Sequence, residues 1–301
     1  MKLKCPHLAK RLLWVGTILT LLLCASCGPP RSDRVVVGSK NFTEQLILGE
    51  LIAQQIEAKT HLSVDRRFYL AGTFICQQAM LSGRIDIYPE YTGTALTAVL
   101  KQSAGGTTQE VFDRVKSGYE QRFHFVLGPP IGFDDTFAIE IRGEDARRLQ
   151  LRTISQAAGH TPQWKPGFGY EFMERPDGYK GLVATYGLHF AESPRIMDLG
   201  LLNRALKEKQ VDLIAGNTTD GLIPAFDFFV LEDDRHYFPP YQAVPVIRQE
   251  TLARHPEIGE AMASLAGKIS EDDMRRLNYA VDGQHRDPVD VVREFRQRKG
   301  L

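Results

Sequence analysis

The chain has 301 residues, of which 43% are hydrophobic and 25% are charged, and its formal net charge is zero. This composition is that of a globular protein long enough to form two domains. Because there is no basic excess and no stripe of interleaved arginines and aromatic rings, we predict no nucleic-acid partner.

The first 26 residues have the organisation of a secretory signal peptide. Basic residues at positions 2, 4, 10 and 11 precede an apolar run at 12–23, which is shorter than the ~20 residues that span a bilayer. Its end, Leu23 to Cys27, resembles the bacterial lipobox. We therefore predict that Cys27 becomes a lipid-modified N-terminus that anchors the mature chain to a membrane. The alternative is simple secretion with a free Cys27.

The mature chain would carry 33 basic and 37 acidic residues, a net charge of −4. Its cysteines are Cys27 and Cys76. Cys76 lies in an apolar pattern, so we expect a small buried hydrophobe rather than a reactive thiol. The cysteines and histidines show no metal-ligand spacing, and we predict no metal and no other cofactor.

Strands and helices alternate after a short polar tether at 27–33. The predicted strands are 34–38, 64–70 and 84–88, and the predicted helices are 43–59 and 72–82. This order is typical of a doubly wound half-domain with a parallel sheet. We expect Asn41 or Thr43 to cap the first helix. Pro89, which has no N–H for a ladder, should end the third strand.

The rest of the chain contains further predicted strands and helices. We predict strands at 125–127, 133–141, 211–215, 228–231 and 243–248, helices at 108–122, 199–209, 251–268, 271–281 and 289–298, and a loop at 164–169. Pro-Pro pairs at 129–130 and 239–240 predict two crossings between two lobes. Lobe one would comprise 33–129 and 240–301, lobe two 130–239, and a ligand would bind between them.

Three polar turns follow predicted strands, at 39–41, 91–94 and 217–220. Ligands of open α/β sheets bind beyond the carboxyl ends of strands. Lys40 and the free N–H groups of the following helix would favour an anion. The alternatives are that Lys40 is a solvated surface charge and that Tyr91 only packs against the next helix.

Aromatic residues in distant segments suggest a site for a cation. Rings such as Tyr91, Phe137 and Tyr241 can together hold a quaternary ammonium, at ~0.5–2 kcal/mol per ring. A lysine and helix N-terminal amides would suit a carboxylate. There is no pairing of a nucleophile with a base and no phosphate loop, and we expect Asp86 and Asp220 to bond the backbone. We therefore predict no catalytic residue.

Five ordered motifs carry a resemblance to a known family. They are 37–45, 83–94, 177–182, 219–221 and 236–241, and they resemble the substrate-binding protein of osmoprotectant ABC importers for glycine betaine, carnitine, choline and proline betaine. The resemblance extends from residue 34 to about residue 296. It implies a type II periplasmic-binding-protein fold, in which two doubly wound α/β lobes joined by two hinge crossings close like a clamshell. It also implies a monomer in the periplasm or on the cell surface that docks on an ABC permease with its ATPase.

The resemblance also implies ligand-binding residues. Tyr91 and Tyr241 fall on the positions of an aromatic cage, and Phe137 falls where a tyrosine is frequent. Asn217 falls where characterised members have an aromatic residue, with Thr218 beside it.

Three further positions follow from the same resemblance. Lys40 and Asn41 fall in the loop that meets the ligand's polar end. Thr94 falls where relatives vary with substrate range.

The amide at Asn217 leaves other functions open. One is binding of a larger betaine such as ergothioneine. Another is a weakly binding paralogue without a role in osmoprotection. A third is a ligand-sensing domain that takes no part in transport.

Overall fold

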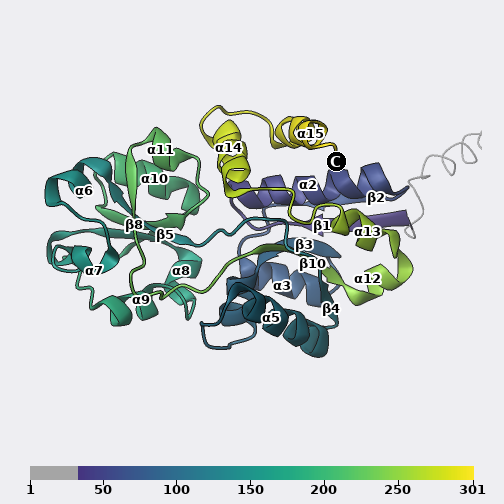
Figure 1. Cartoon of the computed structure of the whole chain (residues 1–301), viewed down its shortest axis with the longest axis horizontal. Coiled ribbons are helices and arrows are strands. Elements are labelled where there is room, and N and C mark those ends of the chain that lie inside the picture. The colour runs from purple at the N-terminus through teal and green to yellow at the C-terminus, as the bar shows by residue number, and fades with distance from the viewer. Residues whose placement is uncertain (1–32) are drawn as a thin grey trace, which may run out of the picture. The chain divides into compact units, whose positions relative to one another are not determined.

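The computed structural model describes residues 33–301, so the predicted signal peptide and Cys27 lie outside the described residues. Residues 35–301 form one compact unit that contains two five-stranded mixed sheets, each covered by helices (Figure 1). We call the part of the chain around each sheet a lobe. The expected two-lobed α/β architecture is present.

The first lobe contains the sheet with strand order β2-β1-β3-β10-β4. Its strands are β1 (Arg34–Gly38), β2 (Ser63–Arg67), β3 (Ile87–Tyr91), β4 (Phe125–Leu127) and β10 (Ala243–Arg248). β1 pairs with β3 in parallel, as predicted, but β10, which follows the strands of the second sheet in the chain, runs antiparallel to both β3 and β4.

Helices bury both faces of this sheet. They are α2 (Thr43–Lys59), α3 (Thr73–Leu81), α5 (Thr108–Phe123), α12 (Gln249–Arg254), α13 (Glu257–Ala263), α14 (Glu271–Asp282) and α15 (Pro288–Lys299). Val35 and Val37 belong to the core beneath α2, α13, α14 and α15, while Val36 packs into the core beneath α3 and α5. This alternation is the period-two pattern of a strand buried on both faces.

The second lobe contains the sheet with strand order β7-β6-β8-β5-β9. Its strands are β5 (Phe137–Arg142), β6 (Pro166–Gly169), β7 (Arg195–Met197), β8 (Leu213–Asn217) and β9 (Phe228–Leu231), and its helices are α6 (Gly143–Leu149), α7 (Ile154–Ala157), α8 (Tyr170–Glu174), α9 (Tyr179–Tyr186), α10 (Leu199–Lys207) and α11 (Leu222–Ala225). β6 is parallel to β7 and β8, whereas β5 is antiparallel to β8 and β9. The prediction of a loop at 164–169 was wrong, because β6 occupies the last four residues of this passage.

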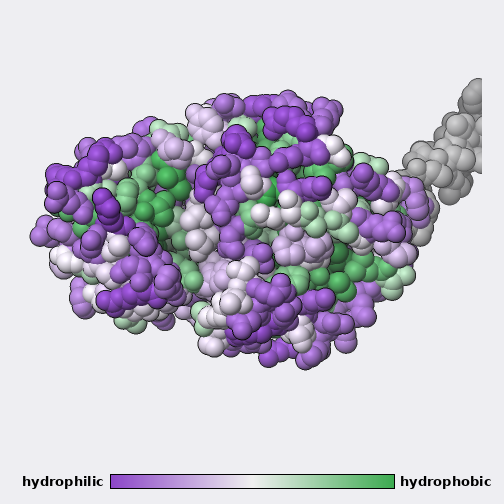
Figure 2. All heavy atoms as spheres, viewed as in Figure 1, coloured by the Kyte–Doolittle hydropathy of each residue, from purple (hydrophilic) through white to green (hydrophobic). Residues whose placement is uncertain are grey.

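Two segments connect the sheets, residues 128–136 between β4 and β5 and residues 232–242 between β9 and β10. The predicted Pro-Pro breaks fall within them. The segments pair through a bridge between Asp134 and Gln242 and through the Asp135 N–H, which donates to the Tyr241 carbonyl at 3.1 Å. Polar and charged side chains cover most of the face seen in Figure 2, as expected of helices whose apolar sides face the sheets.

Pro89 does not end its strand. It lies inside β3, directly opposite Pro245 of β10. The Pro245 carbonyl accepts from Gly128 N at 2.8 Å, on the side away from β3, so this proline pair occupies a position where neither residue needs an N–H toward the other. The predicted turn after Tyr91 is also wrong, because 92–94 begin a helix (α4, Thr92–Thr94) that continues as a π-helix (η2, Ala95–Val99).

Two predictions about helix ends need correction. The N-cap of α2 is Phe42, with no side-chain hydrogen bond, and the Thr43 hydroxyl instead donates to Asp282 Oδ1 at 2.6 Å. The predicted helix 251–268 is divided into α12 and α13 around Pro256, whose ring disfavours helical geometry at His255.

Candidate functional site

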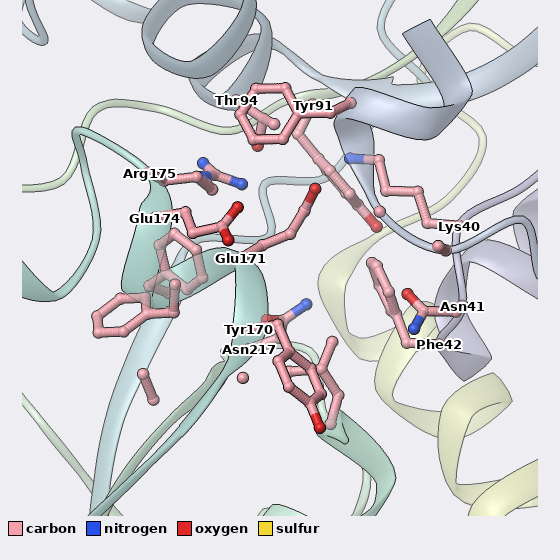
Figure 3. Close-up of a pocket in the computed structure, with 18 of the residues that line it drawn as sticks. Lys40, Asn41, Phe42, Tyr91, Thr94, Tyr170, Glu171, Glu174, Arg175 and Asn217 are labelled. Carbon is pink, nitrogen blue, oxygen red and sulfur yellow. The ribbon is translucent and has the colours of Figure 1, made fainter. Parts of the chain in front are cut away.

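A cavity of about 430 Å³ lies between the two lobes. Figure 3 shows Lys40, Asn41 and Phe42 on one side of it and Tyr170, Glu171, Glu174, Arg175 and Asn217 on the other. The cavity brings together seven of the eight predicted ligand-binding residues, Lys40, Asn41, Tyr91, Thr94, Phe137, Asn217 and Tyr241. Thr218 does not line it. Its N–H donates to the Thr136 carbonyl, and its own carbonyl accepts from Arg275 Nε at 3.1 Å.

Tyr91 ends β3 and is held in place by its hydroxyl and its ring. The hydroxyl donates to Glu44 Oε1 at 2.7 Å, and Phe42 stacks on the ring at 6.5 Å between centroids and 18° between planes. Only 4% of the residue is exposed. Burial, and next the Glu44 carboxylate, raises the pKa of Tyr91 well above its usual value, so the hydroxyl stays a donor.

Tyr241 and Phe137 form a second aromatic group. Their ring centroids are 5.7 Å apart with the planes at 76°, an edge-on contact, and Phe137 also meets Phe172 at 4.9 Å. The Tyr241 hydroxyl donates to Asp177 Oδ2 at 2.5 Å, and its N–H donates to Asp134. The second connecting segment therefore presents this ring to the cavity in one orientation.

Arg175 is a cavity residue that the sequence patterns did not single out. Its Nε and Nη2 donate to the two oxygens of Asp177 at 2.9 and 2.5 Å. Burial lowers the pKa of Arg175, but the Asp177 carboxylate more than offsets this and raises it. The guanidinium carbon lies 4.9 Å from the centroid of Phe137 and 6.0 Å from that of Tyr241. One face of this aromatic group therefore already contacts a protein cation.

Lys40 is not a solvated charge. It is only 2% exposed, and its ammonium forms an ion pair with the buried Glu90 and lies 5.0 Å from the centroid of Tyr91. The N–H groups of this turn also have partners, since Lys40 N donates to Gln45 Oε1 at 3.3 Å and Asn41 N donates to the Ala71 carbonyl at 3.0 Å. These two N–H groups are therefore not available to a ligand, while the expectation of free N–H groups in the first turn of α2 stays a prediction.

Asn217 is the last residue of β8, opposite Phe137 of β5, and so does not lie in a turn. Its Nδ2 donates to Asp135 Oδ2 at 2.7 Å. Asp135 also lines the cavity and is 5% exposed. Behind it, the Thr219 hydroxyl links Asp135 to Glu44, the carboxylate that holds Tyr91. A polar network therefore stands where the family resemblance implied an aromatic wall.

The mouth of the cavity carries acidic groups on α8. Glu171 and Glu174 both line it, and Figure 3 shows them beside Arg175. Gly72, at the start of α3 in the other lobe, faces Glu171 so closely that a Cβ there would lie 2.1 Å from Glu171 Oε1. The two lobes therefore meet at this point because residue 72 has no side chain.

Other expectations concern residues outside the cavity. Asp86 accepts from Val36 N at 2.9 Å and Asp220 from Leu222 N at 2.8 Å, which confirms that both bond the backbone. Cys76 is a buried free thiol, as predicted, and burial raises its pKa to about 12. Among residues 33–301, no group of three or more His, Cys, Asp or Glu could hold a metal ion. No helix in this range has the length and apolar character needed to cross a membrane.

Comparison with known proteins assigns the family. Residues 33–298 match the model described as the substrate binding domain of ABC-type glycine betaine transport systems. The chain is 34% identical over 284 residues to the carnitine transport binding protein OpuCC of Listeria monocytogenes, covering 92% of each. It is 36% identical over 269 residues to the ergothioneine transport permease/ergothioneine binding protein EgtU of Helicobacter pylori (strain G27), covering 89% of this chain and 48% of that protein.

A solved structure gives the same assignment. The crystal structure of a glycine betaine/carnitine/choline ABC transporter superposes with a TM-score of 0.73 at 32% identity, covering 88% of this chain and 98% of that one. The fold and the cavity between the lobes define a substrate-binding protein. The chain belongs to the family of substrate-binding proteins of ABC-type glycine betaine transport systems.

Proposed function

We propose that this protein binds a quaternary-ammonium osmoprotectant of the glycine betaine type in the cavity between its lobes and delivers it to the permease of an ABC importer. The observation that carries this proposal is the convergence of Tyr91, Phe137 and Tyr241, from three distant segments, on one cavity. Each ring that meets a quaternary ammonium contributes ~0.5–2 kcal/mol. Membership of the family supports the same ligand class.

Arg175 is the best-placed partner for a carboxylate at the other end of such a ligand. Its Nε and Nη2 both donate to Asp177. Within residues 33–301, its Nη1 donates to no group. The charge of Lys40, by contrast, is already balanced by Glu90. A zwitterion would then lie with its cation toward Tyr91 and its carboxylate toward Arg175.

Calorimetric titration of the protein lacking residues 1–26 tests this function. We expect saturable binding of at least one compound among glycine betaine, choline, carnitine and proline betaine, and no chemical conversion of it. Arg175→Met should weaken the carboxylate-bearing ligands more than choline, which has no carboxylate. Binding of none of the four compounds would contradict the osmoprotectant function.

Ergothioneine is the second candidate ligand. The specific observation in its favour is the polar wall made by Asn217 and Asp135, which could receive a ring with hydrogen-bonding groups. The 36% identity to a protein named for ergothioneine binding supports the same alternative. Ergothioneine therefore belongs in the titration series, and binding of ergothioneine alone would establish this alternative over the first. Ligand sensing without transport would show as binding with no uptake by cells that also produce the permease and its ATPase.

A further inference from the structure

Two buried carboxyl groups meet at one hydroxyl group directly behind the cavity. Glu44 belongs to α2 of the first lobe, Thr219 follows β8 of the second, and Asp135 lies in the first connecting segment. Their exposures are 3%, 0% and 5%, in that order. Thr219 Oγ1 lies 2.7 Å from Asp135 Oδ1 and is also within hydrogen-bond distance of Glu44 Oε2. We call Glu44 and Asp135 the carboxyl pair.

Other donors to the carboxyl pair are already assigned. Glu44 accepts from the Tyr91 hydroxyl at 2.7 Å and from Asn278 Nδ2 at 3.0 Å. Asp135 accepts from Asn217 Nδ2 at 2.7 Å and from Thr219 N at 3.3 Å. The pair is thus connected to both Tyr91 and Asn217, two of the residues that line the cavity.

Counting protons shows that full ionisation of the pair would leave one carboxylate without a donor from Thr219 in this arrangement. The Thr219 hydroxyl has one proton to donate, and an ionised carboxylate only accepts. With two ionised carboxylates, Thr219 Oγ1 would donate to one and turn a lone pair toward the other. A proton on one carboxyl resolves this, because that carboxyl donates to Thr219 Oγ1, which in turn donates to the other carboxylate.

The surrounding charges also favour retention of a proton. The charged groups around the pair include the carboxyl groups of Glu90, Asp134, Asp220 and Asp282 and the cations Lys40, Arg175 and Arg275. Arg175 is paired with Asp177. Lys40 is paired with Glu90, and Arg275 with Glu271 and Asp272. Burial raises the pKa of both Glu44 and Asp135, and for Asp135 the neighbouring Glu44 adds to the rise.

We propose that the carboxyl pair is a proton-linked counter-charge for the ligand's cation: it holds one proton in the empty cavity and releases it to solvent when the quaternary ammonium binds beside Asp135. The step breaks one carboxyl O–H bond and leaves a second carboxylate, whose charge the ligand cation balances. The proposal rests on the proposed function only in taking a cation as the ligand. Affinity then rises with pH, by up to about tenfold per pH unit, until the empty pair ionises unaided.

Choline and its uncharged isostere 3,3-dimethylbutan-1-ol test this coupling. At each pH from 5 to 8, titrations in two buffers with different ionisation enthalpies count the protons released per ligand bound. We expect release of up to one proton with choline, none with the isostere, and none with choline in Asp135→Asn. Glu140→Gln is a matched control, because this fully buried carboxyl, whose pKa burial also raises, lies outside the cavity and should leave the release unchanged. Choline binding with no proton release at any pH from 5 to 8 would overturn the proposal.

Unfolding of the ligand-free protein separates failure of this inference from failure of the proposed function. A raised pKa means that the folded state binds the proton more tightly than the unfolded state. The stability this provides is complete below the unfolded pKa and is lost as pH rises through the folded pKa. Asp135→Asn and Glu44→Gln should each reduce this loss of stability with rising pH. If both variants keep the wild-type dependence of stability on pH, the inference that the carboxyl pair holds one proton is wrong, whether or not choline binds.

Discussion

At the scale of single residues, both predicted tyrosine rings are oriented by a buried carboxyl group. Tyr91 is oriented by Glu44, and Tyr241 by Asp177, which also holds Arg175. Buried carboxylates of this kind are stable because several donors satisfy them. The aromatic residues were predictable from sequence motifs, but these supporting groups were not.

Removing the Tyr91 ring should weaken ligand binding. We expect Tyr91→Ala to reduce the affinity for a quaternary ammonium by ~1 kcal/mol or more, because the π-face is lost. Tyr91→Phe keeps the ring and loses only the donor to Glu44, so its affinity should fall less. Calorimetry measures both, and Tyr279→Ala, on α14 and outside this cavity, is the control. Wild-type affinity in Tyr91→Ala would show that the cage is misplaced.

At the scale of elements, glycines and prolines caused most errors of prediction. The β6 sequence, Pro-Gly-Phe-Gly, has the composition of a turn, yet all four of its residues are buried in a strand. Gly167 and Gly169 are needed there because a Cβ would lie 3.0 Å from Val211 Cγ1 at the first and 2.5 Å from Leu199 Cδ2 at the second. Local propensity cannot reveal such a need, because the neighbours that crowd the strand come from elsewhere in the chain.

The contact between α8 and the start of α3 leads to a further prediction. Gly72→Ala should displace Glu171 and hinder the approach of the lobes, which would weaken ligand binding by about 1 kcal/mol. When Glu171 is already replaced by alanine, Gly72→Ala should cost less affinity than it does in the wild-type protein. Gly159→Ala, where a Cβ meets nothing within 4 Å, is the matched control. Additive losses in the double variant would contradict a direct contact.

At the scale of the whole molecule, two sheets share one cavity and are joined by two paired segments. The predicted lobe boundaries, at residues 129–130 and 239–240, stay a proposal about where the lobes hinge, as do the monomeric state and the docking on a permease. A ligand that contacts both lobes would favour their closed arrangement to the extent that it binds that arrangement more tightly.

Attachment of the whole protein to a membrane is a prediction that belongs to this scale. Cys27→Ala should abolish lipid modification and release the protein into the soluble extracytoplasmic fraction, because a lipid chain on Cys27 is the proposed anchor. Fractionation and metabolic labelling with a fatty acid measure the two effects. Unchanged processing and membrane attachment in this variant would mean that Cys27 is not the lipidated residue.

The sequence by itself determined the alternating architecture, the ends of α2, β4, β9 and β10, and the residues that could form a ligand site. These features follow from local periodicity and from long motifs that occur together. Only the tertiary structure decided how charge is distributed at that site. It pairs Lys40 with Glu90 and Arg175 with Asp177, and it joins Glu44 to Asp135 through Thr219. Ionisation depends on burial and on neighbours up to 234 positions apart in the chain, and no local pattern contains that information.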